Sequence, residues 1–315
     1  MVVLGRSAQR LAVVAAGALV LGGAASPARV SDALAVFAGD AWQSWWRADR
    51  APARWASEHP VVRNAVTWHR AVPGLEWGEL RLSGAGEAWR LRVILARVEP
   101  SRFNLRLAAK AESRGRLGPW SVSASPEHAS LAMNVGQFSD EGPWGWVMHE
   151  GREFRAPGVG PLSMAVLVDT SGAVRFVTAE SLAVVRARGG IVEAFQSYPV
   201  LLTGDGAVPD AIRESGRGVD LAHRDSRLAI GELRDGRLLV ALTRFEGLGG
   251  ALSELPFGPT VPEMAALMGA LGARQAVMLD GGLSGQMLVR GHDGSKREWQ
   301  GLRRVPLGLV AVPRD

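Results

Sequence analysis

The feature that most constrains this 315-residue chain is a period-of-two alternation of apolar and polar side chains. Residues 75–82, 88–98 and 103–107 all alternate in this way, and Trp89 and Leu91 share one face of the second stretch. Successive side chains of a strand point to opposite faces, so this pattern is typical of a half-exposed antiparallel sheet. The first half of the domain is therefore predicted to be β-structure.

Turn signals separate further apolar runs in the second half of the chain. They are Glu150-Gly151, Ser171-Gly172, Asp205-Gly206 and Asp235-Gly236. Acidic or small residues followed by Gly are favoured in tight turns, so these pairs predict several hairpins. With 47% hydrophobic residues the chain can bury a sizeable core. The predicted fold class is α+β, with a mixed, largely antiparallel β-sheet core and a few packed helices.

The clearest helix follows Pro262. Met264, Leu267 and Leu271 make an apolar stripe that ends at Gly272, a residue common at helix ends. A short connection then leads into an apolar run that we expect to be a buried strand.

An N-terminal helical segment is predicted for residues 31–65, which are rich in Ala and Trp. Trp42, Trp45 and Trp46 fall at helical spacing, so we expect an amphipathic helix that packs on the following domain or touches a membrane surface. Pro60 indicates a boundary near residue 65. The chain is thus divided into residues 1–30, residues 31–65 and a domain of residues 66–315.

Residues 1–30 have the pattern of an export signal. Arg6 and Arg10 precede an uncharged stretch, Leu11 to Ala28, that ends in small residues. The segment is either cleaved or kept as an inner-membrane anchor, so the protein is expected to be exported to the periplasm or the extracellular space. The absence of cysteine excludes disulfides, thiolate metal sites and a lipoprotein anchor.

The net charge of +5 comes almost wholly from arginine, because Lys110 and Lys296 are the only lysines. Arginine binds phosphates and carboxylates, so an anionic partner is compatible with this composition. The arginines form no run or stripe, which argues against nucleic-acid binding. The six histidines show no paired ligand spacing, so neither a metal site nor another cofactor is expected. His223 is retained as a candidate because Arg224, Asp225 and Arg227 surround it in sequence.

The apolar run of residues 276–279 stops at Asp280, Gly281 and Gly282, with Ser284 close behind. Aspartate before glycine often only caps a turn. Consecutive backbone amides also form nests for anions, and Ser284 adds a hydroxyl donor. A carboxylate beside such a nest suggests hydrolysis of a phosphate-bearing substrate. A serine-hydrolase elbow does not fit, because Gln286 stands where its second glycine is required.

Three other stretches accompany this one in a fixed order: Asn134 to Phe138, Pro199 to Gly206 and Arg227 to Gly231. Together with Leu279 to Ser284, they resemble the motifs of the phosphodiester glycosidase family, over roughly residues 128–312. Members of that family include exported bacterial proteins associated with exopolysaccharides. Four motifs in the right order are more specific than any one of them alone.

The resemblance implies hydrolysis of a sugar-1-phosphodiester at the anomeric carbon, through an oxocarbenium-like transition state. It implies catalytic roles for Asp280, Asn134 and Arg227, with Asp280 acting on water or stabilising the cation, Asn134 orienting sugar hydroxyls and Arg227 gripping the phosphate. The implied substrate-binding residues are Gly281, Gly282, Ser284, Gly136, Asp205 and His223. Asp205 is either a second carboxylate or part of a tight turn. The expected partner is a phosphate-bearing glycan or sugar-1-phosphodiester.

The chain departs from the family motifs at three positions. Leu283 and Gly285 replace a glycine and a serine of the last motif, and Val135 replaces a small residue of the first. These departures motivate an alternative, a catalytically inactive envelope module that binds anionic glycan.

Overall fold

The strands at the centre of the main sheet are apolar on both faces, and this determines how the layers stack. The computed structural model describes residues 33–84, 90–111, 117–246, 253 and 255–314. Its largest sheet has nine strands in the order β17-β20-β18-β19-β5-β4-β1-β2, with β3 paired to β4. The strands are β1 (Ala33–Ala38), β2 (Ala41–Arg47), β3 (Thr67–Val72), β4 (Leu75–Ser83), β5 (Leu91–Val98), β17 (Val200–Leu202), β18 (Leu228–Leu233), β19 (Leu238–Phe245) and β20 (Ala273–Leu279).

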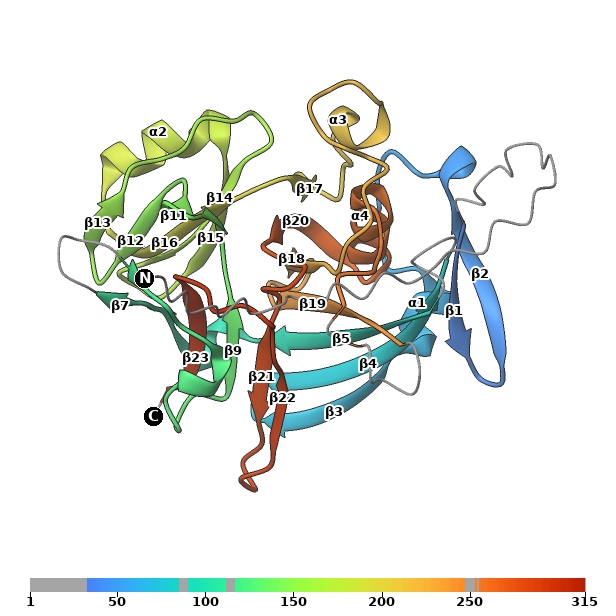
Figure 1. Ribbon diagram of the computed structural model, residues 1–315, viewed down its shortest axis with the longest axis horizontal. Helices are drawn as coiled ribbons and strands as arrows, with labels where there is room; N and C mark the ends of the chain where they lie inside the picture. Colours follow the sequence, from blue (N-terminus) through green and yellow to red (C-terminus); the bar gives the residue numbers. More distant parts are fainter. Residues whose placement is uncertain (1–32, 85–89, 112–116, 247–252, 254, 315) are drawn as a thin grey trace, which may run out of the picture. The chain divides into compact units, whose positions relative to one another are not determined.

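Two five-stranded sheets lie against this large sheet (Figure 1). The first, in the order β13-β12-β16-β14-β15, is built of β12 (Val147–His149), β13 (Arg152–Arg155), β14 (Met164–Asp169), β15 (Val174–Thr178) and β16 (Ile191–Ser197). The second, in the order β22-β21-β9-β23-β6, is built of β6 (Phe103–Ala108), β9 (Leu131–Asn134), β21 (Met287–Arg290), β22 (Lys296–Trp299) and β23 (Gly308–Pro313). Two short pairs complete the strands: β7 (Lys110–Ala111) with β8 (Leu117–Gly118), and β10 (Gln137–Ser139) with β11 (Gly142–Trp144).

Alternate residues of the central strands enter two different cores. Ala229 and Met278 face the core shared with helix α4 (Val261–Ala270). Ile230 and Val277, their neighbours in sequence, face the core shared with the two smaller sheets. A strand covered on both sides must be apolar throughout, which explains the uninterrupted apolar run before Asp280.

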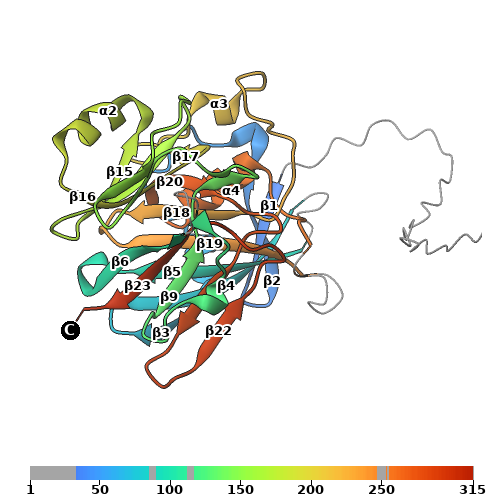
Figure 2. The same ribbon diagram turned by 60° about the vertical axis from the view of Figure 1, so that its left-hand side comes forward.

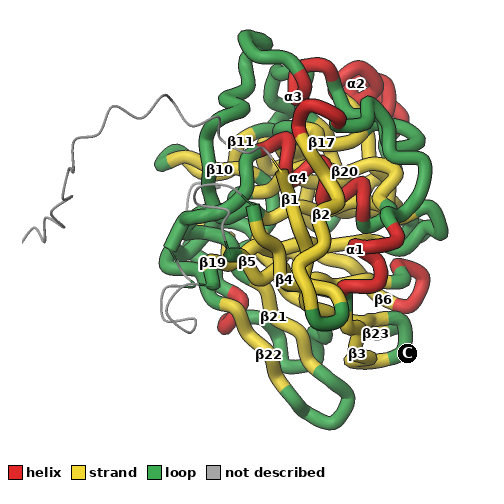
Figure 3. Tube along the Cα trace, turned by 90° about the vertical axis from the view of Figure 1, so that its right-hand side faces the viewer, coloured by secondary structure: helices red, strands yellow, loops and turns green. Residues whose placement is uncertain are grey.

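Helices cover only parts of these sheets, as Figure 3 shows. Helix α4 packs on β17 and β20, and α2 (Ala179–Arg188) packs on β14 and β15 (Figure 2). The other two are short: α1 (Pro60–Ala65) and α3 (Asp210–Arg213). Three-residue 3-10 turns occur at Ala48–Arg50, Pro100–Arg102 and Val122–Ala124.

Helix α4 begins where the sequence predicted and is fixed by a capping box. The Thr260 backbone N–H donates to the Glu263 carboxylate at 2.9 Å, and the Glu263 backbone N–H donates to the Thr260 hydroxyl at 3.3 Å. Gly272 follows the helix with a φ of +93°. The helix then passes directly into β20, as expected.

The predicted strands and hairpins are confirmed. The stretches at residues 75–82, 88–98 and 103–107 correspond to β4, β5 and β6, and each strand pair in the described residues is antiparallel, for example β4 with β5. The turns at Gly151, Gly172 and Gly236 join β12 to β13, β14 to β15 and β18 to β19.

The helix predicted within residues 31–65 is wrong. Residues 33–47 form the hairpin of β1 and β2, which faces the viewer in Figure 3, and only the six residues of α1 are helical. Leu34 and Val36 alternate with less buried neighbours, and Val36 pairs with Leu82 of β4. Gly39, with a φ of +63°, supplies the tight turn between the two strands. Pairing with an existing sheet edge outweighs the helical spacing of the tryptophans.

Residues 31–315 form one compact unit, so β1 and β2 belong to the same sheet as the strands that follow residue 66. The predicted export signal, residues 1–30, lies outside the described residues. Within the described ranges, no helix has the length and apolar character needed to cross a bilayer.

Candidate active site

Asp280 lies immediately after β20, between the ends of β17 and β18. Its backbone N–H donates to the carbonyl of Gly136 at 2.8 Å, so the first and last sequence motifs meet at this point. The φ of Gly136 is +74°, a conformation that favours glycine. The structure therefore places the Gly136 backbone against Asp280, and the substrate-binding role of Gly136 stays a prediction.

Asn134 holds the two ends of the loop 280–286 together. Its side-chain Nδ2 donates to the Asp280 carbonyl at 2.7 Å, and its Oδ1 accepts from the Gln286 N–H at 2.9 Å. The side chain is completely buried. Asn134 is thus a positioning residue for the loop, and the expectation that it orients sugar hydroxyls does not agree with this burial.

Removing the Asn134 amide is expected to loosen this loop. In Asn134→Ala, two buried backbone groups lose their partners, at about 1–3 kcal/mol each. We therefore expect the free energy of unfolding, measured by urea denaturation, to fall by about 2–6 kcal/mol. Asn104→Ala, on the exposed side of β6, is the matched control and should change stability by less than about 0.5 kcal/mol. Equal losses in both variants would contradict the clamp.

The two glycines after Asp280 permit close contact with the segment that leads into β18. A Cβ at Gly281 would overlap the Ser226 carbonyl and lie 3.0 Å from Arg227 Cα. The Gly282 N–H donates to that same carbonyl at 2.7 Å, and the Ser284 N–H donates to the Gly281 carbonyl at 2.9 Å. The amides of Gly282 and Ser284 are therefore engaged inside the protein, and of the two amides predicted to form an anion nest, those of Gly281 and Gly282, the second is not available to a ligand.

Burial raises the pKa of the Asp280 carboxyl to about 6. A hydrogen bond from the Ser284 hydroxyl and the positive charge of Arg303 act in the opposite direction, and the nearby negative charge of Asp225 adds to the rise. A carboxyl group with a pKa near the working pH is suited to acid–base catalysis. Ser284 is itself buried, and its hydroxyl donates to Asp280, whereas the sequence predicted that it would donate to a bound anion.

Asp225 is the second carboxylate of the site, and the sequence did not identify it in that role. A Cβ at Gly282 would lie 3.0 Å from its Oδ2, so this carboxylate lies directly against the Asp280 loop at Gly282. Asp205, the predicted candidate, lies instead past the far end of β17, beside the start of β20. The seven residues of β20 separate it from Asp280 by about 23 Å. Its side chain is 75% exposed and belongs to a tight turn.

Arg227 lies at the site, but its guanidinium is turned inward. Nε donates to the Pro259 carbonyl at 3.0 Å and Nη2 donates to the His223 carbonyl at 2.7 Å. Burial lowers the pKa of the guanidinium, while the charge of Asp225 raises it. With two of its three nitrogens bound to backbone carbonyls, Arg227 does not present the predicted bidentate fork to a phosphate. The exposed His223 ring lies at the rim, 3.9 Å from Asp225 Oδ2.

Arg303 supplies an accessible positive charge that the sequence did not reveal. Its backbone N–H donates to the Leu283 carbonyl at 3.0 Å, which brings it next to the Asp280 loop. Its side chain is 53% exposed, lies over the Phe138 ring at 5.2 Å and is 3.4 Å from Asp140. The Arg303 guanidinium is exposed, whereas that of Arg227 is buried. Arg303 is therefore suited to bind an anionic group near Asp280.

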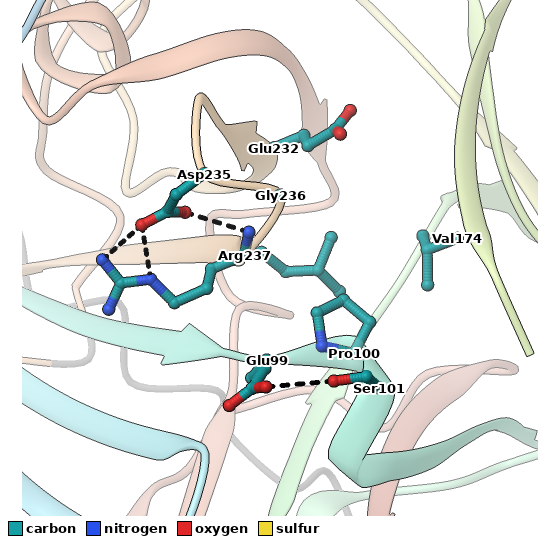
Figure 4. Close-up of a pocket in the computed structure, with 9 residues that line it drawn as sticks. Glu99, Pro100, Ser101, Val174, Glu232, Asp235, Gly236 and Arg237 are labelled. Atoms are coloured by element: carbon teal, nitrogen blue, oxygen red, sulfur yellow. Dashed lines mark hydrogen bonds and ion pairs between the residues drawn. The ribbon is translucent and has the colours of Figure 1, made fainter.

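A cavity of about 330 Å³ lies away from this site (Figure 4). It is lined by the Asp235-Gly236 turn, and the six residues of β18 separate that turn from Arg227 by about 20 Å. Its carboxylates are paired: Glu99 with Arg102, Asp235 with Arg237 and Glu232 with Arg274. In the part of the chain that the structure covers, no group of three acidic or histidine side chains is arranged to hold a metal ion.

Glycoside hydrolases use a pair of carboxyl groups that flank the bond to be cleaved, and Asp280 and Asp225 are two carboxyl groups on adjoining segments. Residues 127–312 match the model of the family described as phosphodiester glycosidase. The chain therefore belongs to the phosphodiester glycosidase family, and the resemblance predicted from its motifs is confirmed. Members of this family are hydrolases that act on phosphodiester-linked sugars.

Two solved structures share the fold. One is the catalytic domain of zebrafish N-acetylglucosamine-1-phosphodiester alpha-N-acetylglucosaminidase, auto-inhibited by its pro-peptide, with a TM-score of 0.59 and 16% identity over 81% of this chain and 91% of that chain. The other is a hypothetical protein from Synechocystis, with a TM-score of 0.52 and 14% identity over 87% of this chain and 65% of that chain. A comparison with curated protein sequences gave no match.

Proposed function

We propose that this protein is an exported hydrolase that cleaves a sugar-1-phosphodiester in cell-envelope or exopolysaccharide metabolism. The observation that carries the proposal is Asp280, whose burial gives it a pKa of about 6, next to Asp225 and Arg303. Family membership supports the substrate class. Export is supported by the basic, then uncharged, pattern of residues 1–30, and cell fractionation should find the protein outside the cytoplasm.

In the proposed reaction, ionised Asp280 takes a proton from water as the water oxygen attacks the anomeric carbon. The bond from that carbon to the phosphate oxygen breaks, and its electrons leave with the phosphate. The products are the free sugar and a phosphate monoester. Asp225 would stabilise the positive charge that develops on the sugar ring, and Arg303 would bind the phosphate.

Hydrolysis in H₂¹⁸O tests the bond that is cleaved. The purified protein is incubated with sugar-1-phosphodiesters of glucose, galactose and N-acetylglucosamine, and the products are examined by mass spectrometry. We expect ¹⁸O in the released sugar. Label in the phosphate would indicate attack at phosphorus, and this would contradict a glycosidase.

The alternative is a module that binds anionic glycan without turnover. It is favoured by Leu283, whose side chain is 45% exposed at the loop, and by the internal use of the Gly282 and Ser284 amides. Binding of teichoic-type or capsular polymers, with no sugar released from any of the three substrates, would support this alternative over the hydrolase.

A further inference from the structure

Tyr198 is an exposed aromatic residue beside the end of β20, the strand that leads to Asp280. Its side chain is 44% exposed, although it follows the buried strand β16. A tyrosine ring exposed to this extent offers an apolar face and a hydroxyl group to a ligand.

The backbone places Tyr198 at the same end of the sheet as Asp280. The Ser197 hydroxyl donates to the Met278 carbonyl, and the Met278 N–H donates to the Pro199 carbonyl at 3.0 Å. Tyr198 therefore lies between two residues that are both hydrogen-bonded to the backbone of Met278, two residues before Asp280. Its own carbonyl accepts from Gln137 Nε2 at 3.0 Å, one residue after the glycine that binds Asp280.

Trp144 supports the tyrosine ring from one side. The two ring centroids are 4.6 Å apart with an interplanar angle of 71°, an edge-to-face contact. The Trp144 ring is itself packed on Gly158, where a Cβ would lie 2.8 Å from the indole. Trp144 thus lies between Gly158 and the Tyr198 ring, and 44% of Tyr198 is exposed to solvent.

We propose that Tyr198, supported by Trp144, is a platform on which the pyranose ring of the substrate packs while its anomeric carbon faces Asp280. This inference rests on the proposed function and extends it to the sugar-binding side of the site. The C–H bonds on one face of a pyranose ring are weakly positive and pack on the negative face of an aromatic ring. Arg303, over Phe138 at the neighbouring hairpin, is placed to bind the phosphate of the same substrate.

Separate probes for the two halves of the substrate test the platform. Binding of methyl α-glycosides of glucose, galactose and N-acetylglucosamine, and of inorganic phosphate, is measured by NMR titration for wild type, Tyr198→Ala and Tyr198→Phe. Trp42→Ala is the matched control, because Trp42 is an aromatic residue of similar exposure, 39%, on the edge strand β2.

We expect Tyr198→Ala to bind the preferred glycoside about 3- to 10-fold more weakly and phosphate as tightly as wild type does. Tyr198→Phe keeps the ring and should bind both probes normally, as should Trp42→Ala. With the diester substrate, KM should rise for Tyr198→Ala by the same factor.

Unchanged glycoside binding in Tyr198→Ala, or an equal loss of glycoside and phosphate, overturns the platform. If the wild type releases sugar while Tyr198→Ala keeps its KM, the platform fails and the proposed function stands. If the wild type neither binds a glycoside nor releases sugar, both fail.

Discussion

Replacing Asp280 with asparagine is expected to lower turnover by about 10² to 10⁴ while making the protein more stable at pH 7. The first effect follows from loss of the proposed proton acceptor. The second follows from the pKa of the carboxyl group, which burial raises from 3.8 to about 6. At pH 7 the folded protein must hold a charge that its surroundings disfavour, at a cost of about 1–3 kcal/mol, and asparagine removes this cost.

The pH dependence of both quantities follows from the same shift. A carboxyl group whose folded pKa is raised binds its proton more tightly in the native state, so its contribution to stability is greatest below pH 3.8 and is lost as the pH rises through about 6. The stability difference between Asp280→Asn and wild type, measured by urea denaturation, should therefore be present at pH 7 and disappear as the pH is lowered to 4. Wild-type turnover should rise with pH through about 6, because the base must be ionised. A variant that retained near-full turnover would remove Asp280 from the mechanism.

Alanine at Gly281 is expected to damage both the fold and the site. Its Cβ would overlap the Ser226 carbonyl and approach Arg227 Cα to 3.0 Å, and neither backbone atom can turn aside. We expect a loss of about 1–3 kcal/mol in the free energy of unfolding. Displacement of Asp280 by about 1 Å should also lower turnover about 10²-fold. Thermal denaturation and sugar release measure the two effects.

Gly285→Ala is the control for this prediction because it lies in the same loop. There the nearest atom is the Leu242 Cδ1 methyl group at 3.1 Å, which can move, so the cost should stay below about 1 kcal/mol. Similar losses at the two positions would show that the loss at Gly281 does not depend on the specific contact with Ser226.

The sequence predicted those parts of the fold in which the local pattern and the final packing agree. The alternation in residues 91–98 became β5, and the capped stripe after Thr260 became α4. The hairpin of β1 and β2 was not predicted, because the spacing of its tryptophans also suits a helix. The pairing of β1 with β4 favours the strand over the helix, and it joins residues almost 50 positions apart, such as Val36 and Leu82.

The site was predicted only in part for the same physical reason. Asp280 ends an apolar strand, a local signal that is visible in the sequence. Asp225 and Arg303 become neighbours of Asp280 only through the approach of Gly282 to Ser226 and the hydrogen bond from Arg303 to Leu283. No spacing rule predicts such contacts. Equally, the sequence could not show that the Arg227 guanidinium turns inward.

The clamp between Asn134 and the loop 280–286 joins two parts of the chain that are synthesised at very different times. The Asn134 side chain and the Asp280 carbonyl are 146 positions apart, and β20 must insert between β17 and β18 before they meet. Arg303 is synthesised later still, because it lies C-terminal to this loop in the sequence. During synthesis, therefore, Asp225, Asp280 and Arg303 cannot come together until nearly the whole chain has been made. Contacts between residues far apart in sequence also slow folding. Under the proposed function, a chain that had not finished folding would not yet hydrolyse its substrate.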